Sequence, residues 1–241
     1  MKTDLKNHTI KPKTKEELKI LIEVERKKHG NNSDLNHIDV SLITDFSFLF
    51  EHSEFNGDIS RWSVSKVVNM ASIFNGSKFN GDISGWNVSS VINMSFVFAN
   101  SEFNGDISRW DVSQSVNMVA MFADSKFNGD ISGWNVSKVD NMEEMFYGSE
   151  FNGDISRWSV SSVTNMIYMF YLSKFYGDIS SWNRAVIKED YNMFLHSVLS
   201  ETVGVYDPGF EKVKTHFLAL RLESDLLQSS PGQSGTLKLR L

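Results

Sequence analysis

The sequence predicts an α/β repeat protein: a right-handed solenoid of short parallel strands and helical turns, capped by a helix at each end. Tryptophan recurs every 24 residues without a slip in register, and a phenylalanine and an aspartate share the same period. Helix-forming segments flank the repeats on both sides. A period of about 20 to 50 residues is typical of stacked architectures, in which each unit buries its apolar face against its neighbours.

The repeat reads FNGDISxWxVSxVxNMxxMFxxSx, and a divergent first unit begins near residue 38. We therefore predict an N-terminal tail and capping helix over residues 1–34, about six to seven repeats over 35–195, and a C-terminal capping helix with a flexible tail over 196–241. The recurring structural residues are Trp62, Trp86, Trp110, Trp134, Trp158 and Trp182, together with Asp58, Asp82, Asp106, Asp130, Asp154 and Asp178.

The first predicted element is a helix over residues 15–29. Thr14 and Glu17 have the spacing of a capping box, and Gly30 follows the basic last turn. Leu18 and Ile22 contribute to an apolar face. We expect this face to cover the first repeat.

Within each repeat, the Asn-Gly-Asp sequence at residues 56–58 predicts a corner, because Asn and Gly tolerate positive φ. Trp62 and Val64 alternate with polar Ser63, which predicts a very short strand with both apolar side chains inward. Ile59 has the wrong parity for that strand, so the chain should bend before Trp62. Neighbouring strands should pair in parallel through right-handed crossovers.

A helical turn is predicted next, over residues 70–74. Met70 and Phe74 are four residues apart, the spacing of neighbours on one helical face, and Asn69 is a candidate N-cap. Gly76 is a candidate C-cap.

The last predicted element is a helix that begins at Asp207-Pro208 and runs to about Gln228. Phe210, Val213 and Phe217 lie on one side of it. This helix should seal the other end of the stack.

Composition excludes several classes of partner. The net charge of -6 and a pI near 5.5 leave no basic stripe for nucleic acid or an anionic membrane. No window approaches about 18 apolar residues, so membrane insertion is not expected. The polar N-terminus has no apolar leader, which favours a cytoplasmic location. Without cysteine there is no disulfide framework and no thiolate zinc site.

A finer pattern doubles the period to 48 residues, because the residue before each repeat alternates in charge. Recent duplication of a two-repeat unit accounts for it, and weak pairing of opposite charges on neighbouring strands can coexist with that history. The alternating residues are Glu54, Lys78, Glu102, Lys126, Glu150 and Lys174.

No pattern in the sequence points to catalysis. The aspartates are best explained by bonds within their own turns rather than by shared calcium, and the tryptophans as core rather than as a carbohydrate platform. The histidines neither share the period nor form HExxH, so no metal site or cofactor is predicted. Nucleophile and phosphate-binding motifs do not occur, and we expect no catalytic residues and no enzyme activity.

The run DISxWxVSxVxNMxxMF, repeated over about residues 38 to 194, resembles the BspA-like leucine-rich-repeat surface proteins and the related mycoplasma lipoprotein-associated repeat. The resemblance implies a leucine-rich-repeat-like solenoid with an adhesive or protein-binding role. It also implies a bacterial protein at the cell surface or secreted. Where relatives often carry cysteine after the second phenylalanine, this chain has serine, for example Ser77 and Ser101.

The leading functional hypothesis is a non-enzymatic scaffold that binds a protein ligand along an extended face. The alternative is a cell-surface adhesin that binds host matrix or other cells, and a secreted enzyme or calcium-dependent module ranks below both. The sequence identifies neither the ligand nor the oligomeric state. Residues that vary between repeats and are expected to be exposed are the candidate binding positions: Ser72, Phe96, Ala120, Glu144 and Tyr168, with Lys66, Ser90, Gln114, Lys138 and Ser162.

Overall fold

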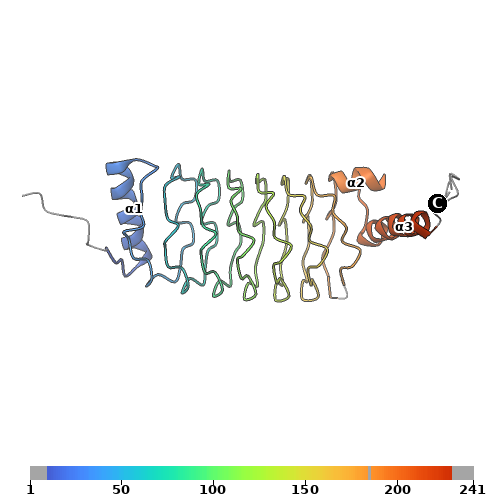
Figure 1. Ribbon diagram of the computed structural model, residues 1–241, viewed down its shortest axis with the longest axis horizontal. Helices are drawn as coiled ribbons and strands as arrows, with labels where there is room; N and C mark the ends of the chain where they lie inside the picture. The colour runs from blue at the N-terminus through green and yellow to red at the C-terminus, as the bar shows by residue number, and fades with distance from the viewer. Residues whose placement is uncertain (1–9, 184–185, 230–241) are drawn as a thin grey trace, which may run out of the picture.

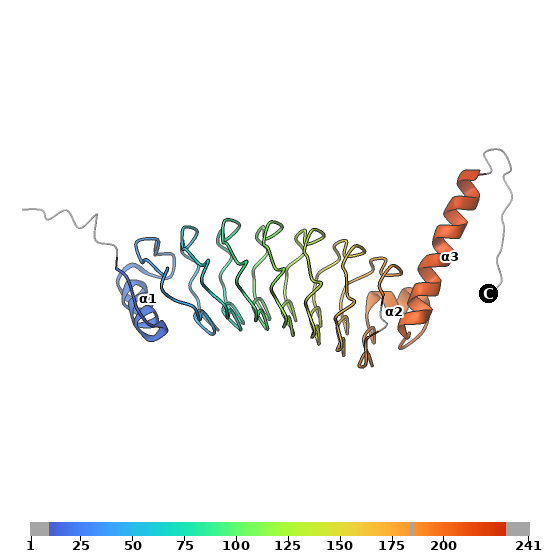
Figure 2. The ribbon, with the colours of Figure 1, turned by 90° about the horizontal axis from the view of Figure 1, so that it is seen from below.

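The protein is an elongated row of chain coils with a helix at one end and two helices at the other (Figure 1). The structure is a computed structural model that describes residues 10–183 and 186–229. Its helices are α1 (Lys15–His29), α2 (Val198–Val203) and α3 (Phe210–Ser229). Between α1 and α2, each 24-residue repeat forms one coil, and successive coils lie side by side (Figures 1 and 2).

The predicted α/β solenoid of short parallel strands is wrong, and with it the leucine-rich-repeat-like fold. The described residues contain helices and turns but no strand. Neighbouring coils are joined instead by isolated parallel bridges at one position per coil, in a column from Asp45–Asn69 to Asn165–Glu189. The predicted right-handed crossovers between parallel strands are therefore not found in the described residues, which contain no strands to connect.

Closely spaced turns explain the missing strands. In one coil they span residues 59–62, 64–67, 70–73 and 74–77, each closed by an N–H that donates to the carbonyl three residues earlier over 2.9 to 3.1 Å. A strand needs consecutive extended residues whose N–H groups point alternately to both neighbours. Trp62 and Val64 do point inward, as predicted, but a turn lies immediately on each side of them.

The predicted helical turn over residues 70–74 is also wrong. Residues 70–77 form two successive four-residue turns, which we call the double turn here and in the equivalent residues of other coils. The third residue of each turn, Ser72 and Gly76, has φ of 56° and 63°, as a type II turn requires. The Met70 and Phe74 N–H groups donate across to the next coil, over 2.9 and 3.1 Å, rather than along a helix.

The corner glycines are needed for space rather than for positive φ. Gly129 is not among the glycines with positive φ in the described part of the chain. A Cβ placed on it would lie 2.8 Å from Cε2 of Phe127, whose ring folds back over the corner. Beside it, the Asn128 N–H donates to Oδ1 of Asn104 in the previous coil over 2.9 Å.

The interior is a set of aromatic columns, as the period predicts. Each of the six tryptophans is at most 4% exposed. The rings of Phe74 and Phe98 stack with centroids 5.8 Å apart. The Trp110 indole N–H donates to the Ile83 carbonyl over 3.1 Å, so the column carries hydrogen bonds as well as apolar contacts.

At the N-terminal end, α1 has the predicted bounds. The Thr14 hydroxyl accepts a hydrogen bond from the Glu17 N–H over 3.1 Å, and Gly30 ends the helix. Leu18 and Ile22 are buried in the core shared with the first coil. Residues 1–9 of the predicted tail lie outside the described residues.

At the C-terminal end, a serine of the repeat starts a helix that was not predicted. Within the stack, the Ser173 hydroxyl accepts the N–H two residues on. Ser197, its equivalent one coil later, accepts from the Ser200 N–H and becomes the N-cap of α2. Helix α3 begins at Phe210, slightly later than predicted, and extends away from the row (Figure 2).

No described helix is both long enough and apolar enough to cross a membrane. The predicted flexible tail over residues 230–241 lies outside the described residues.

Candidate binding surface

The outer side of the double turns carries side chains that differ strongly from coil to coil. Residues 70, 73 and 74 belong to the main core cluster, whereas residues 71–72 and 75–76 lie outside that cluster. We call these outer positions and their equivalents in the other coils the double-turn face. The same backbone therefore presents a different set of side chains in each coil.

One predicted set of binding residues forms a column on this face. All five have positive φ, between 50° and 58°. The exposure predicted for two of them is not found: Ser72 is 5% and Ala120 0% exposed. Ala120 forms a small cluster with Ala99 and Ala123, and Tyr147 packs against that cluster. Phe96 is 38% exposed, and the remaining two are partly buried. The column is Ser72, Phe96, Ala120, Glu144 and Tyr168.

The second predicted set belongs to a different turn, residues 64–67 and its equivalents. Several of its members are engaged between coils: the Ser90 hydroxyl donates to the Ser65 carbonyl over 2.8 Å, and Lys138 Nζ donates to Gln114 Oε1 over 2.7 Å. The structure therefore does not combine the two sets into one site. This second set is Lys66, Ser90, Gln114, Lys138 and Ser162.

Four tyrosines gather on the double-turn face near its C-terminal end. Tyr147 and Tyr171 stack with centroids 5.0 Å apart, and Tyr168 meets Tyr171 edge-on at 5.4 Å. Tyr191 meets Tyr168 edge-on at 5.8 Å. We call these four residues the tyrosine cluster. Among the predicted residues only Tyr168 belongs to it.

Aligning the double turns would have revealed the missed tyrosines. The position of Tyr147 and Tyr171 is occupied by Ala99 and Ala123 in the two preceding coils. Both alanines are buried and form a small apolar cluster that includes Tyr147. The surface therefore changes from small to large aromatic side chains along the row.

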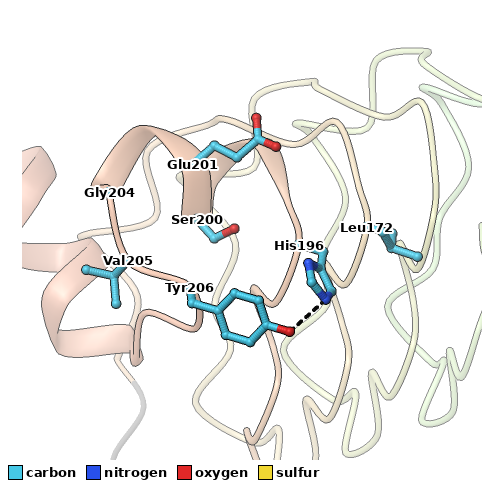
Figure 3. A pocket seen from close by; sticks show the side chains of 7 residues that line it. All are labelled: Leu172, His196, Ser200, Glu201, Gly204, Val205 and Tyr206. Carbon is cyan, nitrogen blue, oxygen red and sulfur yellow. Dashed lines mark hydrogen bonds between the residues drawn. The ribbon is translucent and has the colours of Figure 1, made fainter.

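A cavity of about 600 Å³ adjoins the tyrosine cluster where the last coil meets α2 (Figure 3). His196 points towards Tyr206 across it, with the phenol oxygen 3.1 Å from Nε2. Tyr171 meets the His196 ring edge-on at 5.7 Å, which connects the cavity to the cluster. The lining residues are Leu172, His196, Ser200, Glu201, Gly204, Val205 and Tyr206.

Two carboxylates lie beside the tyrosine cluster in environments that disfavour their charge. Burial raises the pKa of Asp124, and burial followed by repulsion from Glu143 and Asp124 raises the pKa of Glu144. Burial, Tyr171 and these two carboxylates raise the pKa of Tyr147. The Asp124 side chain lies over Gly148, where a Cβ would collide with its Oδ1.

The repeated aspartates occupy a separate edge and serve the backbone. Each accepts a hydrogen bond at Oδ1 from the N–H two residues on, over 2.8 to 2.9 Å. The backbone N–H of Ser108 is the main reason that the pKa of Asp106 is lowered. In the described part of the chain, no group of three or more His, Cys, Asp or Glu residues is placed to hold a metal ion.

A second cavity, of about 530 Å³, lies beside α1. His29 and His37 both approach Glu25 Oε2, at 3.7 and 3.8 Å. These three residues line the cavity together with Ile10, Lys28, Ser33 and Asp34.

Comparison with known proteins identifies the chain at the level of a family. No curated protein and no solved structure matches it. The finer resemblance to BspA-like leucine-rich-repeat proteins is not confirmed. A family model matches twice in overlapping segments, over residues 21–127 and 100–203, which together span most of the chain. The protein therefore belongs to the repeat family described as "Mycoplasma protein of unknown function, DUF285".

Proposed function

We propose that this protein is a non-enzymatic scaffold that binds a protein partner on the C-terminal half of the double-turn face. The tyrosine cluster is the observation that carries the proposal. Tyrosine provides a large, fairly rigid contact area with a polar end, and for that reason it is enriched where proteins bind each other. The cluster also continues towards the cavity of Figure 3, which extends the candidate contact area.

The contrast between backbone and side chains supports this assignment. Turns, bridges and core columns repeat from coil to coil, so they serve the stack itself. The tyrosines are not repeated in the earlier coils, where alanine occupies two of the same positions. Residues confined to one region of an otherwise regular surface are well suited to recognising one partner.

The cavity beside α2 offers little support for catalysis. The Ser200 hydroxyl donates to the Ser197 carbonyl over 2.7 Å, and the described contact of His196 Nε2 is with the Tyr206 hydroxyl. A nucleophile is activated by a base within hydrogen-bond reach. In the described residues this serine and histidine are not paired in that way.

Affinity capture tests the proposal with a matched pair of variants. The full chain is used as bait in lysate of its source organism, beside Tyr147→Ala/Tyr171→Ala and beside Gln114→Ala/Lys138→Ala. Alanine already occupies the tyrosine position in two coils, so the first variant should fold. We expect it to lose a partner that the wild type and the second variant retain.

Two results would contradict the proposal. One is capture of the same proteins in the same amounts by all three baits. The other is loss of the partner only in Gln114→Ala/Lys138→Ala, which would move the binding site to the 64–67 turn and its equivalents.

The alternative function, a cell-surface adhesin, is a narrower form of the same proposal in which the partner is extracellular. Fractionation of the source organism separates the two. Recovery of the protein in the envelope or medium would favour the adhesin.

A further inference from the structure

The corner side of the stack presents the same four positions of each coil to the outside. Between residues 53 and 59 the side chains alternate between buried and exposed, so residues 54, 56 and 58 point outwards. Residue 61 is exposed on the turn that follows. Successive coils lie side by side, so each position forms a column along the row (Figure 1). We call the columns that begin at Glu54, Asn56, Asp58 and Arg61, and recur every 24 residues through six coils, the corner face.

The first column of the corner face alternates in charge at every step. Its members are Glu54, Lys78, Glu102, Lys126, Glu150 and Lys174. Neighbours along it approach one another: the Glu102 carboxylate lies 3.5 Å from Lys78 Nζ and 2.7 Å from Lys126 Nζ. The five side chains from Lys78 onwards are still 40 to 65% exposed. Each can therefore accept a second partner from outside the chain.

The last column of the corner face alternates in size. Its members are Arg61, Gly85, Arg109, Gly133, Arg157 and Ser181. A Cβ on Gly85 or Gly133 would meet nothing within 4 Å, so packing inside the chain does not require glycine there. The two glycines leave gaps between large, charged side chains.

The aspartate column between them is not served evenly by these arginines. In one coil, a backbone N–H lowers the pKa of Asp106, and Arg109 lowers it further. In the next coil, a backbone N–H again lowers the pKa of Asp130, but the neighbouring aspartates oppose this and no arginine of the described chain takes part. That coil has Gly133 at the arginine position. The glycine coil thus leaves its aspartate without an arginine of its own.

The charge column becomes complementary to itself when a second copy faces it in reverse. A two-fold axis that crosses the row between the third and fourth of the six coils sets the first coil opposite the sixth, the second opposite the fifth and the third opposite the fourth. Glutamate then meets lysine at every position, whereas a parallel copy in register would set like charges together. The facing pairs are Glu54 with Lys174, Lys78 with Glu150, and Glu102 with Lys126, each formed twice.

The arginine column fits the same arrangement. Every arginine faces a coil that has glycine or serine at its position. Arg109 of one copy faces Gly133 of the other, so its side chain enters the gap there and lies beside Asp130. Each pair of facing coils brings together two aspartates and one arginine, which can donate to both carboxylates.

We propose that two copies of this chain associate in antiparallel orientation through the corner face, with the two-fold axis between the coils of Glu102 and Lys126. Six coils at about 4.8 Å each and seven extended residues give a face about 25 Å long and about 20 Å wide. Two copies bury on the order of 1,000 Å², the lower end for specific interfaces. Exposed ion pairs contribute only about 0 to 1 kcal/mol each, so the dimer is weak and depends on the whole array.

Two charge swaps within the first column test this proposal as a matched pair. The variants Lys78→Glu/Glu102→Lys and Glu102→Lys/Lys126→Glu both keep the net charge and the composition of the chain. Each also creates two pairs of like-charged neighbours along the column. Only the first sets like charges against each other in the facing copy, whereas the second keeps glutamate opposite lysine throughout.

Sedimentation velocity of the full chain at low ionic strength, over a wide range of protein concentration, measures the dissociation constant of the dimer. We expect a monomer–dimer equilibrium for the wild type. Lys78→Glu/Glu102→Lys should raise the dissociation constant by at least about tenfold, which is about 1.4 kcal/mol. Glu102→Lys/Lys126→Glu should leave it nearly unchanged. Circular dichroism verifies that each variant is folded.

A second variant tests the gaps in the arginine column. Gly85→Arg/Gly133→Arg adds side chains where the chain itself has room for them, so it should fold. In the antiparallel dimer it sets arginine against arginine. We therefore expect it to weaken the dimer as well.

Disulfide cross-linking tests the orientation, since the chain contains no cysteine of its own. Oxidation of a mixture of the single variants Lys78→Cys and Glu150→Cys should join one variant to the other. Lys78→Cys should not join to itself, because the two copies of residue 78 lie three coils, about 14 Å, apart in the antiparallel dimer, beyond the reach of a disulfide.

The proposal is overturned if the wild type stays monomeric at every concentration, if the two charge swaps weaken the dimer equally, or if Lys78→Cys joins to itself as readily as to Glu150→Cys. A dimer that is weakened only by Tyr147→Ala/Tyr171→Ala would place the contact on the double-turn face and overturns it too.

Discussion

Trp110 shows how a single side chain can both fill the core and join two coils. Its ring is 3% exposed, and its indole N–H donates to the Ile83 carbonyl. That carbonyl also accepts the Trp86 backbone N–H. A buried carbonyl that serves two donors fixes the turn of one coil against the ring of the next.

Replacing this ring gives the first prediction. Trp110→Phe removes the indole donor and leaves unfilled volume, so it should lower the free energy of unfolding by about 2 to 4 kcal/mol. Phe96→Ala removes a 38% exposed ring and should cost clearly less. Urea unfolding of both variants measures the difference, and equal losses would contradict the assignment of Trp110 to the core.

Acid should destabilise the fold through the repeated aspartates. Backbone hydrogen bonds lower the folded pKa of Asp106 and Asp130, so the unfolded chain binds these protons more readily. Their contribution to stability is present above the unfolded pKa and is lost as the pH falls below about 4 through the folded pKa.

We therefore expect the urea midpoint to fall in that range, and Asp106→Asn/Asp130→Asn to reduce the fall. Asp124→Asn is the control, because burial raises the pKa of Asp124 and its linkage has the opposite sign. The same acid dependence in the aspartate double variant and the wild type would refute this prediction.

At the residue level, inward and outward positions could be predicted, but backbone conformation could not. Alternation of Trp62 and Val64 with Ser63 was enough to place the side chains. The positive φ of Phe96 and Ala120 has no local signal, since no described coil has glycine at their position. At the other positive-φ position of the double turn, glycine occurs in two described coils, as Gly76 and Gly148. Stacking against neighbouring coils imposes this conformation.

At the level of elements, the double turn is the main difference from the prediction. Inward residues at positions 70, 73 and 74 have the spacing of a helical face. Two successive four-residue turns have the same spacing, because each begins with an inward residue. The sequence therefore could not distinguish them, and hydrogen bonding to the next coil decides for the double turn.

The corner offers a prediction for this level, since two glycines of one coil have different surroundings. A Cβ on Gly129 would lie 2.8 Å from the Phe127 ring, whereas a Cβ on Gly133 would meet nothing within 4 Å. Gly129→Ala should therefore lower the free energy of unfolding by about 1 to 3 kcal/mol, as overpacking does. Gly133→Ala should change it by less than about 0.5 kcal/mol. Chemical unfolding tests both, and equal effects would show that the corner relaxes around the new methyl group.

At the level of the whole molecule, the stacking of coils followed from the 24-residue period, but the binding surface did not. The tyrosine cluster joins Tyr147, Tyr168, Tyr171 and Tyr191 from three successive coils, and which positions share a face depends on the turn structure. The predicted helical turn placed Tyr168 outside but gave no reason to group it with the other three. The register between coils, seen in the bridges, brings them together.

That register gives a last prediction. The bridges connect residues 24 apart, so removing residues 79–102 should bring Asn69 opposite Asn117 and leave a shorter stack with the same contacts. We expect this variant to fold cooperatively, with a smaller urea m-value because less surface is buried.

Removing residues 79–90 deletes half a coil and sets core positions opposite surface positions, so this variant should not show a cooperative transition. The 24-residue deletion also places Lys78 beside Lys126, but exposed charges contribute only about 0 to 1 kcal/mol, too little to prevent folding. If both deletions unfolded alike, coil-to-coil register would not be what holds the molecule together.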